Sequence, residues 1–489
     1  MNKHLVCYVL GWVMIVIGAM LSLPIIVSFI YHESDFLYFG LLAAACMAVG
    51  LISIKIKPKN TTMYVREGYI SCALTWVLLS VIGCLPFYIS GSIPDFTDAL
   101  FESVSGFTTT GATILGTNRQ IEDLIHSMLF WRSFTNWAGG MGILVFMLAV
   151  ISQLSGQSNM YLMKAESPGP VVSKLIPKLR GTAVVLYAIY GVMTLIEFLM
   201  LVIGRMPVFD ALTVSFSTAG TGGFSIKNAG LMAYEGHYYW QAVATAFMFL
   251  FAVNFSIYYL IITKKFKQIL LSEELRWYFI IFAGAVILIG LDLTINKVYD
   301  NQLDIWHHAA FQVSTYISST GFASKDYDLW PSLSRTTLMI VALVGACAGS
   351  TGGGLKVSRV VVLAKSVMRD IRQMLHPNSV YTVKMDGKAV KEDTVRSIHV
   401  YLTLFVFVFA LSVGILSLDE KMNFETNFTA VIATINNMGP GLADVGPTKN
   451  FYEYSTISKY VLIFDMLAGR LELLPMLLLF NVECWSNKR

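Results

Sequence analysis

Ten apolar runs, each of about 20 residues or more, constrain the fold of this chain more than any other feature. They cover residues 5–30, 36–54, 69–90, 126–152, 181–204, 237–263, 277–296, 334–365, 396–418 and 455–481. A helix of about 20 apolar residues crosses the hydrocarbon region of a bilayer. The pattern therefore predicts an all-α polytopic membrane protein that resides in a lipid bilayer.

The composition agrees with this class. Hydrophobic residues make up 55% of the chain and charged residues only 13%, with a mean hydropathy of +0.63; soluble domains carry about 25% charged residues. The formal net charge of +4 is too small to indicate nucleic-acid binding. The six cysteines lie in or beside apolar runs and form no CxxC pair, so neither a disulfide framework nor a metal site is predicted.

Lysine and arginine lie mainly on one side of these runs. The N-terminus and residues 55–66, 153–181, 264–276, 356–396 and 486–489 hold 24 of the 35 basic residues. The alternate loops are acidic, and they contain short segments of about 12 residues that are too short to span. Because basic loops face the cytoplasm, we expect both termini to be cytoplasmic and the short segments to enter from outside.

The short segments form an internal repeat. Residues 98–112 read DALFESVSGFTTTGA, 210–224 read DALTVSFSTAGTGGF, 308–322 read HAAFQVSTYISSTGF and 426–440 read TNFTAVIATINNMGP. Without gaps, one glycine column results: Gly111, Gly223, Gly321 and Gly439. A single segment of this kind is commonly a surface helix with a glycine cap, but four copies at one place in the topology favour a repeated unit.

The unit is a span, a short pore helix, a glycine loop and a second span, and all four loops face the same side. We therefore expect four parallel repeats in a pseudo-fourfold arrangement, preceded by a helical hairpin. The predicted segments are an N-terminal transmembrane hairpin at 1–62 and pore repeats at 63–165, 166–270, 271–385 and 386–489.

This arrangement suits a cation. Backbone carbonyls can replace the hydration shell of an ion, and glycine permits the backbone angles that turn carbonyls toward an axis. The C-terminal end of each short helix carries about half a negative charge. Polar residues precede the glycines, and acidic residues in the outer loops would raise the local cation concentration.

Two interruptions of the apolar pattern stand out. Residues 345–354, GACAGSTGGG, break the eighth run; they indicate either close helix packing through small residues or a flexible gating loop, which we favour. Arg470 lies within the last run, where a charge needs a partner or water. It could pair with Glu472 or a carbonyl, and we expect it to hold carbonyls of residues 345–354. Lys356 could act similarly or extend to the cytoplasm, and Arg132 is interpreted as a structural anchor.

The motifs SGFTTTGAT (105–113), WRSFTNWAGGMGI (131–143), FSTAGTGGFS (216–225), STGF (319–322), CAGSTGGGLKV (347–357), NNMGPGL (436–442) and MLAGRLEL (466–473) together resemble the Trk/Ktr/HKT superfamily of potassium transporters, of the bacterial TrkH type. The resemblance covers nearly the whole chain. It implies potassium uptake across the bacterial cytoplasmic (inner) membrane through a selectivity filter, by a homodimer on a cytoplasmic TrkA-type ring of nucleotide-binding regulatory subunits. This chain has no nucleotide motif and no predicted cofactor, so NAD or ATP would act only through that partner, with potassium as the substrate.

The repeat pattern and the resemblance together indicate the site residues. The filter would comprise Thr109, Thr110, Gly111, Thr221, Gly222, Gly223, Ser319, Thr320, Gly321, Asn437, Met438 and Gly439. The gate would comprise Gly345, Gly349, Ser350, Thr351, Gly352, Gly353, Gly354, Lys356 and Arg470.

Two other functions compete with a gated potassium channel. One is a symporter that couples potassium to protons or sodium, against which stands the lack of an obvious relay among the buried acids. These acids are Glu197, Asp292, Asp465 and Glu472. The other is a membrane enzyme, for which the sequence offers no nucleophile–base pair, metal-ligand cluster or phosphate loop.

Overall fold

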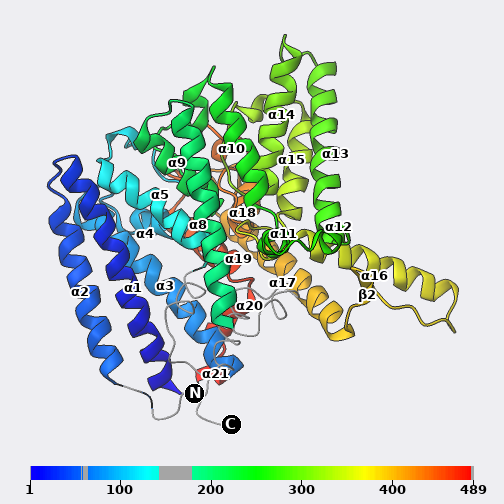
Figure 1. The fold of residues 1–489 in the computed structure, drawn as a ribbon, viewed down its shortest axis with the longest axis horizontal. Coiled ribbons are helices and arrows are strands. Elements are labelled where there is room, and N and C mark those ends of the chain that lie inside the picture. The colour runs from blue at the N-terminus through cyan, green and yellow to red at the C-terminus, as the bar shows by residue number, and fades with distance from the viewer. Residues whose placement is uncertain (1, 57, 59–63, 143–178, 486–489) are drawn as a thin grey trace.

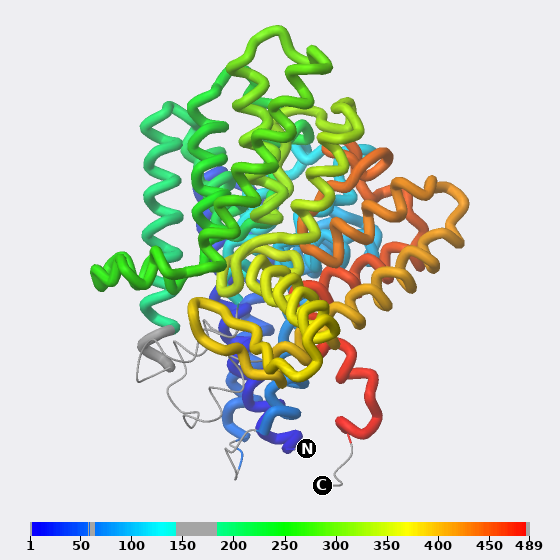
Figure 2. Tube along the Cα trace, turned by 90° about the vertical axis from the view of Figure 1, so that its right-hand side faces the viewer, coloured from blue at the N-terminus to red at the C-terminus, as the bar shows by residue number. Residues whose placement is uncertain are grey.

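The computed structural model describes residues 2–56, 58, 64–142 and 179–485, and the predicted helical, polytopic class is confirmed. Six helices of the described residues are long and apolar enough to span a membrane. In the same residues, the strands amount to one two-residue antiparallel hairpin, β1 (Lys384–Met385) with β2 (Lys388–Ala389). The N-terminus of α1 and the last helix, α21 (Val482–Trp485), lie at the same end of the molecule (Figures 1 and 2).

The N-terminal hairpin pairs α1 (Lys3–Ile30) with α2 (Phe36–Lys55) at one edge of the bundle (Figure 1). Glycines let the two backbones approach closely: a Cβ atom on Gly50 would lie 2.8 Å from the carbonyl oxygen of Gly11. Small residues serve helix packing in membranes in this way. The predicted boundary at 62/63 falls outside the described residues.

Four units of the expected kind follow the hairpin. Each first span is one unbroken helix, and each short helix after it is the predicted pore helix. The first spans are α3 (Val65–Ile89), α8 (Leu179–Ile203), α13 (Glu273–Ile295) and α17 (Glu392–Leu416). The pore helices are α4 (Phe96–Phe107), α9 (Val208–Gly220), α14 (Gln302–Ile317) and α18 (Phe424–Ile435).

The pore helices form the core of the molecule. Residues 101–110, 311–320 and 429–439 are buried without interruption. Local capping starts three of these helices, because side chains of Asp95, Asn301 and Asn423 accept backbone N–H groups of the first turn. The same buried core therefore places the C-terminal ends of the pore helices deep inside the protein.

The second span of each unit does not run through as one helix, which corrects two predictions. The run at 237–263 divides into α10 (Tyr238–Phe251) and α11 (Phe255–Ile262), bent by 91°, and the run at 455–481 divides into α19 (Thr456–Arg470) and α20 (Leu474–Leu479). Asn254 caps α11 through its side chain. Glu472 and Leu473 adopt positive φ directly before α20, which has Pro475 in its first turn.

The other two second spans also begin with a helix of limited length, 13 residues in α15 and 15 residues in α5. α15 (Ser332–Val344) and α16 (Val357–Leu375) flank the predicted interruption, and α16 extends away from the bundle (Figure 1). α5 (His126–Gly140) occupies the start of the run predicted at 126–152. The rest of that run from residue 143, the basic segment to residue 178 and the predicted boundary at 165/166 lie outside the described residues.

Short elements complete the chain. The helix α12 (Phe266–Leu270) follows α11 and projects sideways (Figure 2). Single 3-10 turns lie in the loops that follow the pore helices, at Ile121–Asp123, Gly230–Tyr234, Tyr327–Leu329 and Ala443–Val445.

Candidate functional site

The four pore helices end with the same hydrogen-bond pattern. The backbone N–H groups of Thr110, Gly222, Thr320 and Met438 each donate to the carbonyl five residues earlier, at 2.8–2.9 Å. The residue before each of them is left-handed: Thr109, Thr221, Ser319 and Asn437 have φ between 52° and 59°. This is the Schellman type of helix end, so four dissimilar sequences adopt one backbone geometry.

The next residue in each loop is a glycine of the predicted column, with φ of 79° at Gly111, 68° at Gly223, 85° at Gly321 and 92° at Gly439. A side chain would strain this conformation. Space is also lacking: a Cβ atom on Gly111 would lie 1.9 Å from the carbonyl oxygen of Gly222, and one on Gly223 would lie 2.0 Å from that of Thr320.

These contacts run in order around a closed ring. Gly321 faces the carbonyl oxygen of Met438, 2.2 Å from a built Cβ, and Gly439 faces that of Thr110 at 2.8 Å. Each loop thus meets the next, and the fourth returns to the first. We call residues 109–111, 221–223, 319–321 and 437–439 the four-loop ring; it contains all twelve residues assigned to the filter.

Side-chain hydrogen bonds support the ring within single loops and between the fourth loop and the first. The hydroxyls of Thr108 and Thr110 lie 2.8 Å apart, and those of Ser318 and Thr320 lie 2.7 Å apart. Asn437 donates to the Thr110 hydroxyl at 3.0 Å and to the Met466 carbonyl at 2.8 Å. The sequence interpretation did not include Thr108 and Ser318, although each lies two residues before its predicted partner.

A buried ion pair, Arg132 with Glu102, supports the first two loops of the ring. The side chain of Arg132 donates to Glu102 and to the carbonyl of Ser225, both at 2.5 Å, and its guanidinium lies 3.8 Å from the Phe224 ring centre. Glu102 also accepts from Thr113 at 3.0 Å. These contacts fit the expected anchoring role of Arg132, while Glu102 was not anticipated.

The comparisons with known proteins agree on one family. The model of the TrkH family, described as a cation transport protein, matches residues 32–488. The chain is 33% identical to the Trk system potassium uptake protein TrkH of Salmonella typhimurium (strain LT2) over the full length of both. The chain belongs to the TrkH family.

Further relatives support this membership. The Vibrio parahaemolyticus protein named Trk system potassium uptake protein TrkH is 34% identical over 86% of each chain. The crystal structure of the potassium transporter TrkH from Vibrio parahaemolyticus superposes with a TM-score of 0.87 at 29% identity, covering 99% of this chain and all of that one. TrkH relatives are transport proteins, so the membrane-enzyme alternative is set aside.

In this TrkH-family chain the predicted interruption is a non-helical segment, residues 345–354, which we call the glycine-rich loop. Repeat 2 holds it through backbone bonds: Cys347 N–H donates to the Ala252 carbonyl and Phe255 N–H donates to the Gly349 carbonyl, both at 3.0 Å. The loop also lies against the ring, because Gly353 N–H donates to the hydroxyl of Ser319 at 2.5 Å.

Arg470 contacts carbonyl oxygens from two parts of the chain. Its guanidinium donates to the carbonyl of Thr351 at 2.9 Å and, from its other terminal nitrogen, to those of Gly139 and Gly140 at 2.5 and 2.7 Å. One side chain therefore joins the glycine-rich loop to the end of α5. Glu472 forms an ion pair with Arg359 of α16.

Other assigned gate residues shape the same loop. Lys356 donates to the carbonyl of Gly352, so it is directed at the loop, and Ser350 donates to that of Cys347 at 2.5 Å. Gly345, Gly349 and Gly354 have φ of 71°, 71° and 82°. The sequence interpretation missed Glu274, whose buried carboxylate accepts Ala348 N–H at 2.7 Å and Ser358 N–H at 3.3 Å.

Several acids in and beside the loops around the pore helices have local structural roles. Asp95 caps α4 through Asp98 N–H at 3.0 Å, and Asp98 pairs with Lys459 at 2.6 Å in a buried contact. Lys325 donates to Glu235, which lowers the pKa of that exposed carboxyl. No group of three or more acidic, histidine or cysteine side chains in the described part of the chain could hold a metal ion.

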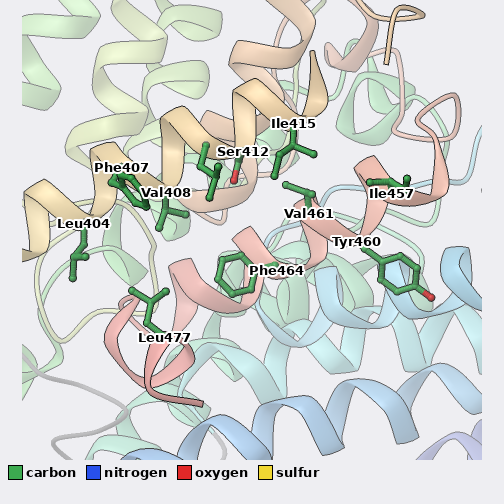
Figure 3. A pocket seen from close by; sticks show the side chains of 11 residues that line it. Leu404, Phe407, Val408, Ser412, Ile415, Ile457, Tyr460, Val461, Phe464 and Leu477 are labelled. Carbon is green, nitrogen blue, oxygen red and sulfur yellow. The ribbon is translucent and has the colours of Figure 1, made fainter. Parts of the chain in front are cut away.

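An apolar groove of about 500 Å³ lies apart from the ring, between α17 and α19 (Figure 3). Leu404 and Val408 line it from α17, and Ile457 and Phe464 line it from α19. Ser412 also lines the groove and donates to the buried Asp465 at 2.8 Å. None of the residues that line the groove belongs to the four-loop ring.

Proposed function

We propose that this chain is a channel-like subunit for potassium uptake and that the four-loop ring is its selectivity filter. The observation that carries the proposal is the closed order of contacts, in which each column glycine faces the carbonyl oxygen that precedes the next column glycine. Relatives of full-length similarity are named potassium uptake proteins, which supports potassium as the substrate.

The chemistry follows from backbone oxygens. A carbonyl carries no net charge, so it can replace water around an ion without trapping it. The four helix C-termini add partial negative charge at the same place. The twelve ring residues would supply the oxygens from three successive positions of each loop, and the glycines would leave the axis unobstructed. No resident cofactor is needed for this task.

We propose that the glycine-rich loop is the gate beneath this filter. Its backbone bonds to α10 and α11, its contact with Ser319 and the bridge from Arg470 give it a defined resting position. A guanidinium at this depth also repels a cation that leaves the filter. The residues assigned to the gate in this part of the chain would move together, because they form one short segment. They are Gly345, Gly349, Ser350, Thr351, Gly352, Gly353, Gly354 and Lys356.

Regulation would come from outside the chain. We propose a homodimer in the bacterial inner membrane, with both termini in the cytoplasm, on a TrkA-type ring whose nucleotide, NAD or ATP, shifts the gate. The exposed apolar side chains of α16, such as Met368, Ile371 and Met374, and its link to Glu472 through Arg359 support α16 as the element that transmits this signal. The division into a hairpin (1–62) and repeats at 63–165, 166–270, 271–385 and 386–489 is part of the same proposal.

The alternative is a symporter that couples potassium to protons or sodium. Two membrane-buried acids favour it, Glu197 of α8 and Asp465 of α19, each with one or more oxygens that accept no hydrogen bond from the described residues. They belong to different repeats and do not contact each other through any described bond, which is why we place the channel first.

A reversal-potential measurement in reconstituted liposomes tests the proposal. For a channel, we expect the potassium current to reverse at the potassium Nernst potential at every pH and sodium gradient. A reversal potential that moves with the proton or sodium gradient would replace the channel by the symporter. Absence of any potassium current or flux, with the protein correctly folded, would remove both.

A further inference from the structure

The four left-handed residues of the ring share a backbone geometry but differ in what their side chains contact. Thr221 donates to the carbonyl of Gly220 at 2.6 Å, and Asn437 reaches Thr110 and Met466. The hydroxyl of Thr109 has no hydrogen-bond partner among the described residues. Of these four side chains, Ser319 is the one that bonds to the glycine-rich loop, by accepting Gly353 N–H at 2.5 Å.

The glycine-rich loop fits against this part of the ring without spare room. A Cβ atom on Gly353 would lie 2.0 Å from the carbonyl oxygen of Asn436, and one on Gly352 would lie 2.6 Å from that of Ser318. Two consecutive residues of the loop thus contact the ends of α14 and α18. Movement of the loop would remove contacts from the residues that directly precede the third and fourth ring segments.

We propose that Ser319 is a positioning residue that couples the glycine-rich loop to the third segment of the ring, so that the ion in the ring and the position of the loop influence each other. The inference rests on the proposed function. It goes beyond that function because it assigns the link to one hydroxyl and to one of the four repeats.

Backbone strain makes this link effective. A side-chain-bearing residue in the left-handed region is unfavourable and persists because its surroundings hold it. At Ser319 part of that support is the bond from the loop. A ring well occupied by potassium would fix Ser319 in the geometry that accepts Gly353 N–H, whereas sodium, a smaller ion, would leave it less ordered. Coupling of this kind is reciprocal in equilibrium terms.

The test reads loop position directly through Cys347, a buried residue of the loop. The full-length chain in liposomes is treated with N-ethylmaleimide in potassium chloride or sodium chloride, and modified Cys347 is quantified by peptide mass spectrometry. We expect labelling to be about fivefold slower in potassium, the factor that one net hydrogen bond contributes. Ser319→Gly, which tolerates the positive φ but lacks the hydroxyl, should label equally fast in both salts.

Two variants provide the controls. Ser319→Thr retains a hydroxyl and should keep the ion dependence. Lys297→Gly makes the matched change at an exposed left-handed residue of the third repeat that lies outside the ring (φ of 51°), and should also keep it. Ser319→Ala provides a second removal of the hydroxyl if the glycine variant folds poorly.

Equal labelling of the parent chain in the two salts would overturn the inference, as would an unchanged ion dependence in the folded Ser319→Gly or Ser319→Ala chain. Either result leaves the proposed potassium pathway intact, because labelling does not measure flux. Failure of that pathway would be seen instead as a parent chain without potassium-selective flux in the same liposomes.

Discussion

Gly111 combines two constraints that no other residue type satisfies. Its φ is 79°, and a Cβ atom would lie 1.9 Å from the carbonyl oxygen of Gly222. We expect Gly111→Ser to displace that carbonyl and to lower the potassium-to-sodium permeability ratio about tenfold, equivalent to about 1.4 kcal/mol. Reversal potentials under bi-ionic conditions, with potassium on one side and sodium on the other, would measure this ratio.

Gly236 is the matched control for this change. It has a φ of 85° but nothing within 4 Å of a built Cβ atom, so Gly236→Ser introduces the same backbone strain in an exposed outer loop. The potassium-to-sodium permeability ratio of the Gly236→Ser chain should equal that of the parent chain. An unaltered ratio in Gly111→Ser would remove Gly111 from the filter.

Glu102 illustrates a residue whose role is to hold others. Its pair with Arg132 is almost fully buried, and loss of one partner of a buried pair costs about 3–5 kcal/mol. Glu102→Gln should therefore lower the thermal unfolding midpoint in detergent strongly. Glu425→Gln, at the exposed pair with Arg335, should change stability by less than about 1 kcal/mol. Similar midpoints for both variants would contradict the bracing role.

At this residue scale the sequence located the glycine column but not its supports. The repeat alignment alone identifies Gly111, Gly223, Gly321 and Gly439, because glycine is required in the backbone itself. The partners Glu102 and Glu274 act through contacts between segments far apart in sequence, and such contacts leave no local pattern.

At the scale of elements, the bridge from Arg470 is the contact that connects repeat 1, the glycine-rich loop and α19. Arg470→Ala removes both ends of the bridge, and we expect a severalfold higher resting potassium flux in liposomes. Shortening residues 345–354 should act in the same direction. A resting potassium flux equal to that of the parent in both the Arg470→Ala chain and the chain with a shortened 345–354 segment would refute the gating role of the glycine-rich loop.

Arg470→Lys separates charge from bridging. A lysine keeps the positive charge but has a single ammonium group, so it cannot reproduce the fork that reaches Thr351 on one side and Gly139 and Gly140 on the other. Flux close to that of the alanine variant would assign the effect to the bridge, and flux close to that of the parent would assign it to electrostatic repulsion. The same flux assay distinguishes the two.

Helix boundaries show where the sequence was sufficient. The predicted runs at 5–30 and 36–54 correspond to α1 and α2, which span Lys3–Ile30 and Phe36–Lys55, because an isolated hairpin in lipid is defined by hydrophobic length. The breaks after Phe251 and Arg470 were missed, because the hydropathy of an apolar run is the same whether its helix is continuous or interrupted. Asn254 and Pro475 were the available signals.

At the scale of the molecule, the sidedness that we propose can be tested without flux. A cysteine at Asn378, between α16 and the small β-hairpin, should react with a membrane-impermeant maleimide only after cells are permeabilised. A cysteine at Gly236, in an outer loop, should react in intact cells. The opposite result would reverse the assigned orientation.

The closing contact of the ring joins Gly439 to Thr110, and Asn437 donates to Thr110 across 327 positions of the chain. During synthesis, three quarters of the ring would therefore be inserted before its final quarter leaves the ribosome. A chain truncated after the third repeat would lack the segment that contacts both of its neighbours. Closure of the ring during biogenesis thus depends on the fourth repeat, the last of the four ring segments to be synthesised.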